Sequence, residues 1–384
     1  MVTQIQIPTD WVLRKVGEIA PLQRGFDLPT KQIVKGEYPV VYSNGILNYH
    51  NTFQAKAPGV VTGRSGTIGK VTYVEQDYWP HNTSLWVTDF KGNDPKFVYY
   101  LYSFLRLERF STGSGVPTLN RNDVHTFEIL IPKYRKEQSV LAKALSDTDA
   151  LIESLDKLIE KKKNIKQGAM QELLTGKVRI SGFHDAWETK EIYRFADVTA
   201  GGTPSTFFPA YWNGDIKWMS SGELNLKKVY DVDGRITELG LKNSSTQLLP
   251  KKCVLIGLAG QGKTRGTVAM NYIELCTNQS IGAILPNDNF VPEFLYYNLD
   301  SRYNELRQLS TGEGGRGGLN LTIIRNILVT LPQTKKEQSA IAKLLEDMDL
   351  EIKALEQKRD KYKQLKVGLM QQLLTGRIRL KCKN

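Results

Sequence analysis

The chain has 384 residues, of which 40% are hydrophobic and 24% charged, a balance typical of folded proteins with two or three domains. No apolar run approaches the roughly 18 residues that span a bilayer, and the first ten residues lack the pattern of a secretion signal. We therefore expect a cytoplasmic protein with no membrane partner. The net charge of +12 indicates nucleic acid as the first candidate partner, although a basic protein without such a partner fits equally well.

Residues that usually carry chemistry form no recognisable constellation. The three cysteines, Cys253, Cys276 and Cys382, include no C-x-x-C pair, and the four histidines are scattered. The sequence contains no G-x-S-x-G elbow, no H-E-x-x-H helix and no [DN]-P-P-[FY] tetrapeptide of adenine methyltransferases. We expect a non-catalytic binding protein with no metal site and no cofactor of its own.

The chain up to Pro132 is predicted to form a first head of mixed α and β structure. Short β-branched runs predict strands at 60–62, 70–74 and 84–87. An amphipathic helix is expected over 97–109, and a glycine-rich loop over 111–115.

A heptad pattern next predicts a long helix from Lys136 to Leu174. Proline is absent from this stretch, and Gly176 stands where a C-terminal cap is expected. The apolar positions that we expect to pack against a partner helix are Leu141, Leu145, Ile152, Leu155 and Ile159.

A second head and a second helix repeat this plan. Strands are expected at 253–256 and 267–270, a helix over 292–306, and a glycine-rich loop over 312–318. Nearly half of the positions are identical when 133–180 is placed on 333–380, and Trp11 matches Trp187 upstream. The second set of helix-packing positions is Ile341, Leu345, Met348, Ile352, Leu355 and Tyr362.

The repeat predicts an α+β protein with an internal pseudo-two-fold arrangement. Two mixed heads are joined by two long helices, each the natural partner of the other in an antiparallel coiled coil. The expected domains are 1–132 and 180–332 for the heads, and 133–179 and 333–384 for the helical spacers. Most of the net positive charge lies on the helical spacers, where it indicates either a nearby polyanion or a solvated helix face.

One segment fits a nucleotide-binding loop. Gly257 to Thr264 matches G-x-x-x-x-G-K-[ST], but the following residues read as a strand and not as the helix that such a loop should open. The matching tract of the first head, Gly63 to Lys70, keeps the glycines without the pattern. A turn between two strands explains both tracts, and an NTP-binding regulator that uses Lys263 is the alternative.

Several motifs resemble one family. Gly202-Thr203-Pro204-Ser205 and the stretch from Tyr211 to Leu224 resemble the opening of a target-recognition domain in specificity subunits of type I restriction-modification systems. The two Lys-Glu-Gln tripeptides at 136–138 and 336–338, and the segments 168–176 and 368–376, are similar to that family's helical regions. The first head departs from the pattern, because Leu22 to Pro29 stands in place of Gly-x-Thr-Pro-Ser and resembles a second variant of the recognition domain.

The resemblance implies a non-catalytic subunit of a larger complex. Each head would read one half of a bipartite, asymmetric site in double-stranded DNA, and the helices would space the heads and dock two modification subunits. Restriction subunits, the motor and nuclease, would join this core. S-adenosylmethionine, ATP and Mg would be bound by those partners and not by this chain. A coiled-coil scaffold with no nucleic-acid role is a further alternative.

Polar side chains on the turns and glycine-rich loops are the expected DNA contacts, because loops on a rigid scaffold can enter the major groove. Some of them could instead only hold the loops, since Asn and Ser often bond to nearby backbone. The candidates in the first head are Arg64, Ser65, Lys70, Asn82, Thr83, Asn120 and Arg121. Those in the second head are Thr203, Ser205, Ser220, Ser221, Lys263, Arg265, Gln279, Arg316 and Asn320.

Overall fold

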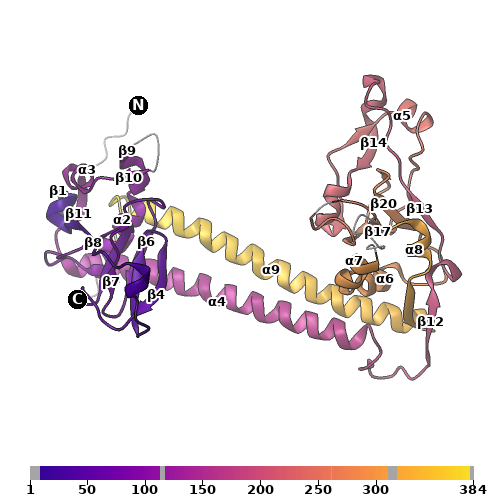
Figure 1. Ribbon diagram of the computed structural model, residues 1–384, viewed down its shortest axis with the longest axis horizontal. Coiled ribbons are helices and arrows are strands. Elements are labelled where there is room, and N and C mark those ends of the chain that lie inside the picture. Colours follow the sequence, from indigo (N-terminus) through magenta and orange to yellow (C-terminus); the bar gives the residue numbers. More distant parts are fainter. Residues whose placement is uncertain (1–8, 113–116, 261, 310–317, 381–384) are drawn as a thin grey trace. The chain divides into compact units, whose positions relative to one another are not determined.

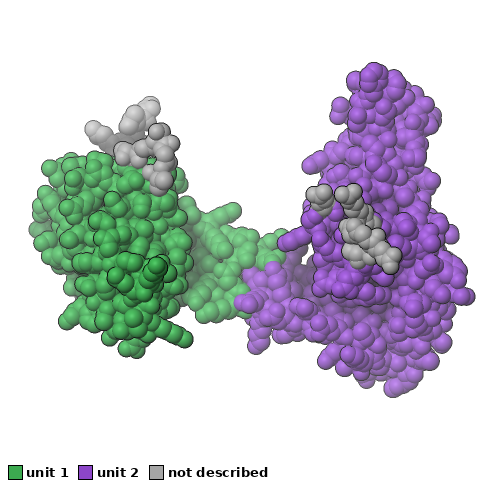
Figure 2. All heavy atoms as spheres, in the orientation of Figure 1, with its two compact units in different colours: residues 1–157, 356–384 green, residues 158–355 purple. Residues whose placement is uncertain are grey.

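The computed structural model describes residues 9–112, 117–260, 262–309 and 318–380. The chain divides into two compact units (Figure 2). Unit 1 comprises residues 1–157 and 356–384, and unit 2 comprises residues 158–355. Each unit therefore contains one head together with parts of both long helices.

Two small sheets form the head of unit 1. The first is antiparallel, in the order β2-β8-β5-β6, and consists of β2 (Leu22–Arg24), β8 (Ser84–Val87), β5 (Gly59–Gly63) and β6 (Val71–Val74). The second has the order β4-β3-β7, with β4 (Gly45–His50), β3 (Tyr38–Tyr42) and β7 (Trp79–Pro80). The predicted strands at 60–62, 70–74 and 84–87 correspond to β5, β6 and β8. Shorter elements are β1 (Trp11–Lys15) with β11 (Glu128–Pro132), β9 (Ser111–Thr112) with β10 (Thr118–Leu119), α1 (Val16–Ile19) and α3 (Arg121–Thr126).

The single helix predicted over 97–109 is two helices. Asp94 caps α2 (Pro95–Phe104) by accepting from two backbone N–H groups, and a 3-10 helix covers Leu107–Phe110. Between them Arg106 has a φ of 50°, which ends the α-helix. Leu105 and Leu107 are both buried, and residues two apart on one helix would face different sides, so the break lets both reach the core.

The head of unit 2 contains a related but larger sheet. Its order is β13-β20-β17-β18-β15, formed by β13 (Val198–Ala200), β20 (Ile281–Ile284), β17 (Val254–Gly257), β18 (Val268–Asn271) and β15 (Lys228–Val229). The predicted strands at 253–256 and 267–270 are β17 and β18. A three-stranded sheet contains β16 (Arg235–Ile236), β14 (Trp212–Met219) and β19 (Cys276–Thr277), and β12 (Trp187–Glu191) pairs with β21 (Leu328–Pro332). The remaining α-helices of this head are α5 (Glu238–Lys242), α6 (Pro292–Ser301), α7 (Tyr303–Leu309) and α8 (Leu321–Arg325), so the helix predicted over 292–306 is also interrupted, at Arg302.

The two long helices form as predicted and pair in antiparallel fashion (Figure 1). They are α4 (Arg135–Leu173) and α9 (Lys335–Leu373), of 39 residues each. In unit 1, Lys366 near the end of α9 lies 2.6 Å from Asp149 near the start of α4. In unit 2 the roles are exchanged, and Lys166 of α4 lies 2.5 Å from Asp349 of α9. This pairing confirms the predicted α+β class with an internal repeat.

The helix-packing residues divide between two environments. Leu141 and Leu145 belong to the core of the first head, and Ile341 and Leu345 belong to the core of the second. The first two predicted positions of each helix therefore anchor a head as well as a helix. Further along the seam, the buried positions are Leu155, Ile159 and Ile352, and the half-buried positions are Ile152, Met348, Leu355 and Tyr362.

A buried glutamate ties each head to both helices. In unit 1, the carboxylate of Glu137 accepts from the indole of Trp11 at 3.2 Å and from the guanidinium of Arg379 at 2.8 and 2.9 Å. In unit 2, Glu337 accepts in the same way from Trp187 and Arg179. The repeated Lys-Glu-Gln motif thus has a structural role, because its glutamate links the start of one helix to the segment that follows the other.

Two predicted loop features lie partly or wholly outside the described residues. The tract 111–115 begins as strand β9, which pairs with β10, and is described only to residue 112. The tract 312–318 is described only at Gly318, so the candidate Arg316 lies outside the described residues. Gly176, the expected cap, and its counterpart Gly376 have φ angles of 73° and 71°, a conformation that favours glycine after a helix.

Candidate nucleic-acid interface

Four candidates of the first head meet at one edge of its larger sheet. The end of β5 lies beside the start of β8, so the loop after β5 adjoins the loop before β8. The backbone N–H groups of Arg64 and Ser65 donate to the carbonyl of Thr83, at 2.9 and 3.2 Å. The Arg64 guanidinium donates to the carbonyl of Asn82 at 3.3 Å. This one bond engages a single N–H of a group with five, which leaves donors for a ligand.

The edge also contains residues that the sequence did not single out individually. The amide of Asn82 donates to Asp27, and Asp27 pairs with Arg24 at 2.9 Å. Lys70 donates to the carbonyl of Asn44 on a neighbouring loop. Arg24 and Asp27 lie within Leu22 to Pro29, the stretch that stands in place of the usual opening motif. Their position in this stretch was the signal in the sequence that could have identified them as candidates.

His81 adds a neutral group to this edge. Its Nδ1 lies 3.0 Å from the Thr83 hydroxyl, and its ring lies 4.2 Å from that of Tyr42, centroid to centroid. Burial lowers the pKa of His81 below its ordinary value, while the nearby Asp27 opposes the shift. The neutral imidazole can donate one hydrogen bond and accept one, and this capacity suits a site that contacts polar groups.

The corresponding edge of the second head gathers its own candidates. The Thr203 hydroxyl donates to the Gln279 amide at 2.5 Å, and the carbonyl of Met219, next to Ser220, accepts from Asn278 at 3.0 Å. Ser220 shares a capping box with Glu223 at the start of a 3-10 helix (Ser221–Leu226), and Ser221 is half-buried in its first turn.

An exposed aromatic pair follows Ser205 in the second head. The Ser205 hydroxyl accepts from the backbone of Phe207 at 3.4 Å. Phe207 is 84% exposed and lies 5.4 Å from Phe208, centroid to centroid, and no sequence motif singled out either ring. Aromatic side chains at such positions can stack on or wedge between bases.

The segment that fits a nucleotide-binding loop is a turn between two strands. β17 pairs in antiparallel fashion with β18, opposing Ile256 to Val268. No helix begins in the described part of the turn, residues 258–260 and 262–267, so no helix N-terminus faces a phosphate there. Lys263 is exposed, and its carbonyl accepts from Thr267 and Tyr303; Arg265, in the same turn, is half-buried. This geometry contradicts the NTP-binding alternative.

Two asparagine candidates act as helix caps. The side-chain oxygen of Asn120 accepts from the backbone of Asn122 at 3.0 Å at the start of α3. That of Asn320 accepts from Ile323 at 2.8 Å at the start of α8. Both side chains therefore stabilise a helix terminus. Arg121, in the first turn of α3, is exposed.

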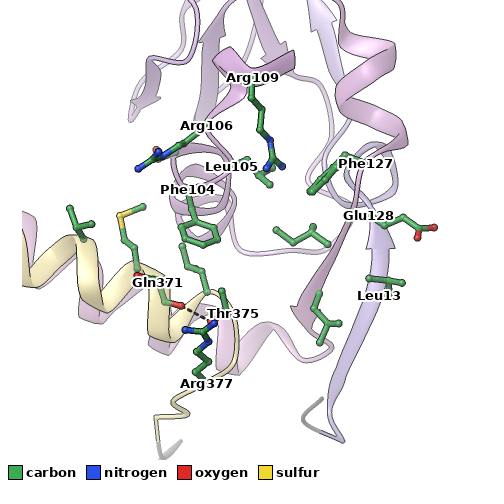
Figure 3. Close-up of a pocket in the computed structure, with 16 residues that line it drawn as sticks. Leu13, Phe104, Leu105, Arg106, Arg109, Phe127, Glu128, Gln371, Thr375 and Arg377 are labelled. Carbon is green, nitrogen blue, oxygen red and sulfur yellow. Dashed lines mark hydrogen bonds between the residues drawn. The ribbon is translucent and has the colours of Figure 1, made fainter. Parts of the chain in front are cut away.

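A groove of about 680 Å³ lies elsewhere on unit 1 (Figure 3). Phe104, Leu105 and Phe127 line it together with Thr375 and Arg377, which follow α9. Its lining is mainly apolar and contains no pair of side chains arranged for acid–base or nucleophilic chemistry. Among the residues that the structure describes, no group of His, Cys, Asp or Glu could hold a metal, and no helix is long and apolar enough to cross a membrane.

The two sheet edges can recognise a polar ligand without transforming it. Arg and Lys suit the acceptors of guanine and of phosphate, and Asn and Gln suit the adenine edge. Such groups converge in each head from separate loops held by paired strands. The two edges differ in sequence while their supporting sheets correspond, as expected of two modules that read different targets.

Comparison with known proteins places the chain in one family. The pattern of the type I restriction modification DNA specificity domain matches residues 8–164 and 184–364. Two type I restriction enzyme specificity subunits of Methanocaldococcus jannaschii are 31% and 26% identical, over 42% and 74% of this chain and 38% and 71% of their own lengths. One from Escherichia coli is 23% identical over 89% of this chain and 87% of its own. The solved S subunit from M. genitalium has the same fold, with a TM-score of 0.66 at 16% identity over 97% of this chain and 98% of that one.

The match includes both heads and most of both helices, in agreement with the internal repeat. The chain therefore belongs to the type I restriction-modification DNA specificity family, as a sequence-specificity subunit that is not itself an enzyme.

Proposed function

We propose that the two heads read the two halves of one bipartite, asymmetric site in double-stranded DNA. Residues 1–132 would form one recognition domain and residues 180–332 the other. The observation that carries this proposal is the equivalent placement of two unlike polar edges on corresponding sheets. Two copies of one scaffold with different loops suit two half-sites of different sequence.

The contacts are proposed to come mainly from the polar side chains at these two edges and on the adjoining turns. In the first head these are Arg64 and Lys70 with the neighbouring Ser65, Asn82, Thr83 and Arg121, and in the second head they are Thr203, Ser205, Ser220, Ser221, Lys263, Arg265 and Gln279. Exposed Lys263 would act on phosphate as a point charge, because it projects from a turn and not from a nucleotide-binding loop. Asn120 and Asn320 would support the loops as caps.

The helical spacers, 133–179 and 333–384, are proposed to set the separation of the two domains and to dock two modification subunits. Their sequence likeness supports this role, because two similar surfaces suit two identical partners. Restriction subunits would then join the complex. S-adenosylmethionine, ATP and Mg would be bound by those partners, and the complex would act in the cytoplasm.

Exchange of one head tests the proposal directly. Residues 1–132 are replaced by the first head of another specificity subunit, and the methylated sites are sequenced in cells that contain the modification subunit. We expect one half-site to change while the other half-site and the spacer persist. In the control, the chain's own first head is removed and reinserted through the same junctions. A change in both half-sites, or in neither, would contradict independent reading by the two heads.

A further inference from the structure

The two heads differ at one edge of their corresponding sheets. In unit 2, the short strand β15 (Lys228–Val229) adds to β18 in parallel, and all four residues of β18 are buried. In unit 1, the corresponding strand β6 ends its sheet, and Val71, Thr72 and Tyr73 are only half-buried. Among the described residues, the first head has no strand in the place of β15. An unpaired sheet edge can accept an added strand.

Backbone register shows which groups are left open. Met270 and Tyr272 in and after β18 donate their N–H groups to the carbonyls of Lys227 and Val229, each at 2.8 Å. Alignment of β5 with β17 places Tyr73 and Glu75 at the corresponding positions. The N–H of Gly63 donates to the carbonyl of Lys70. In an antiparallel pair of strands only every second pair of opposed residues is hydrogen-bonded, so Val61 and Thr72 form such a pair and Val60 and Tyr73 do not. The N–H of Tyr73 therefore points away from β5. No acceptor for the N–H of Tyr73 or Glu75 is found in the described part of the chain.

A groove lies beside this open edge. It has a volume of about 620 Å³ and is lined from four sides, by Tyr73 to Gln76, by Pro39 and Ile46, by Lys96 and Tyr100, and by the α4 residues 146, 149, 150 and 153. The charged groups on its walls are Glu75, Asp149, Glu153 and Lys96. Lys96 already pairs with Glu75 at 3.5 Å. Glu153 pairs with Lys157 of the same helix at 2.7 Å, which leaves Asp149 as the wall carboxylate to compare with unit 2.

Unit 2 shows how such a space is filled. The ammonium of Lys228 on β15 lies 3.3 Å from Glu346 and 3.5 Å from Asp349, and 5.7 Å from the ring centroid of Tyr297. Asp349 accepts this lysine although it also pairs with Lys166 and receives the hydroxyl of Tyr297.

The first head has the corresponding acceptor without the lysine. Asp149 pairs with Lys366 at 2.6 Å and receives the hydroxyl of Tyr100 at 2.8 Å. It thus matches Asp349 in every contact except the one to the added strand. Asp349 accepts two cations in unit 2, and Asp149 offers the same acceptor for a second cation in unit 1, where Ser146 stands in place of Glu346.

We propose that β6 is a strand-acceptor site for an extended segment of a protein partner, with a lysine or arginine followed by an apolar residue. The segment runs parallel to β6, as β15 runs along β18, and accepts hydrogen bonds from the backbone of Tyr73 and Glu75. Its basic side chain lies against Asp149 beside the ring of Tyr100. The inference rests on the proposed function, in which protein subunits assemble on this chain, and it assigns one of their contacts to the first head alone.

Amide hydrogen exchange of the full chain, alone and assembled with its modification subunit, tests the proposal. In the free chain, the amides of Tyr73 and Glu75 should exchange at least about tenfold faster than those of Met270 and Tyr272. Assembly should slow both by about tenfold or more. Unchanged exchange of these two amides in a complex that forms would overturn the strand site and leave the proposed function intact. Failure of the two proteins to assemble would instead count against the proposed function.

Two variants locate the effect. Glu75→Pro removes an outward N–H at the end of an edge strand, where proline is tolerated, and should weaken assembly about fivefold, the factor expected for one hydrogen bond. Glu75→Ala is the matched control, since it removes the carboxylate but keeps the N–H, and it should weaken assembly less. Protection of the β5 and β8 amides in each variant shows that the sheet is intact. Equal assembly by Glu75→Pro and the unaltered chain would overturn the proposal.

Discussion

Replacing Asn320 by alanine separates a structural role from a DNA-binding role. The side-chain oxygen accepts one hydrogen bond, from the backbone of Ile323 at 2.8 Å, and Asn320 itself is exposed. Loss of such a cap costs about 1 kcal/mol. The cost falls on unit 2, because α8 carries Ile324 into that core. For a unit of this size, a loss of about 1 kcal/mol lowers Tm by about 2–4 °C.

The matched variant Asn320→Asp distinguishes the two roles. A carboxylate keeps the cap acceptor and favours a helix N-terminus, so the Tm of unit 2 should be retained. The same carboxylate would repel a nearby phosphate, so it should weaken DNA binding only if Asn320 lies against DNA.

Calorimetry and DNA titration at several salt concentrations, on the assembled complex well below its Tm, measure the two effects. We expect Asn320→Ala to lower Tm and to leave DNA affinity within about twofold. An unchanged Tm with at least a tenfold loss of DNA affinity would refute the capping role. Asn120→Ala provides the internal replicate in unit 1, where the oxygen accepts from Asn122 at 3.0 Å.

Four further outcomes are expected. Arg64→Ala should weaken specific DNA binding by about 1–3 kcal/mol if the guanidinium is bidentate to guanine, and equal titration curves for the variant and the unaltered chain would remove that contact. Leu345→Ala, at a position that is 0% exposed, should lower the free energy of unfolding of unit 2 by about 2–5 kcal/mol in a denaturant titration, whereas a loss below about 1 kcal/mol would contradict its place in the core. Burial holds the pKa of His125 below its ordinary 6.5, Arg121 lowers it further, and Nε2 accepts from the backbone of Leu22 at 2.8 Å. The unfolded chain therefore binds the proton more readily than the folded chain, and the stability of unit 1 should fall as the pH drops below about 6.5. His125→Gln should reduce this fall in stability. Four residues inserted after Leu174 should lengthen the unspecified spacer of the DNA site by about one or two base pairs, from about 1.5 Å per helical residue against 3.4 Å per base pair, and should leave both half-sites unchanged. If sequencing of the methylated sites found an altered half-site with an unchanged spacer, the helices would not set the separation of the half-sites.

Local patterns in the sequence were sufficient to predict the long helices and the strands β5, β6, β8, β17 and β18, but not the strands of the two three-stranded sheets. Heptad spacing and the absence of proline determine a helix within a few residues of its ends, as at α4 and α9. The break at Arg106 was not predicted, because the burial of both Leu105 and Leu107 depends on the rest of the head.

The candidate site was predicted as a set of loops but not as a set of contacts. Arg64 and Thr83 meet because β5 pairs with β8, a register that no local motif specifies. Asn120 and Asn320 were selected for their polarity, which suits capping and base contact equally, and only the backbone around them identifies the cap.

The sequence by itself determined the duplication, the α+β class, the two long helices and the family resemblance, because each depends on residue spacing or identity along the chain, whereas contacts such as Lys166–Asp349 show that the helices are antiparallel. The turn predicted for the segment from Gly257 to Thr264 was confirmed by the pairing of β17 with β18, whereas tertiary structure alone decided the register of that pairing. It also decided that β6 ends its sheet while β18 receives β15. The physical reason is that strand pairing joins backbone groups far apart in the sequence, and such pairing depends on packing throughout the head.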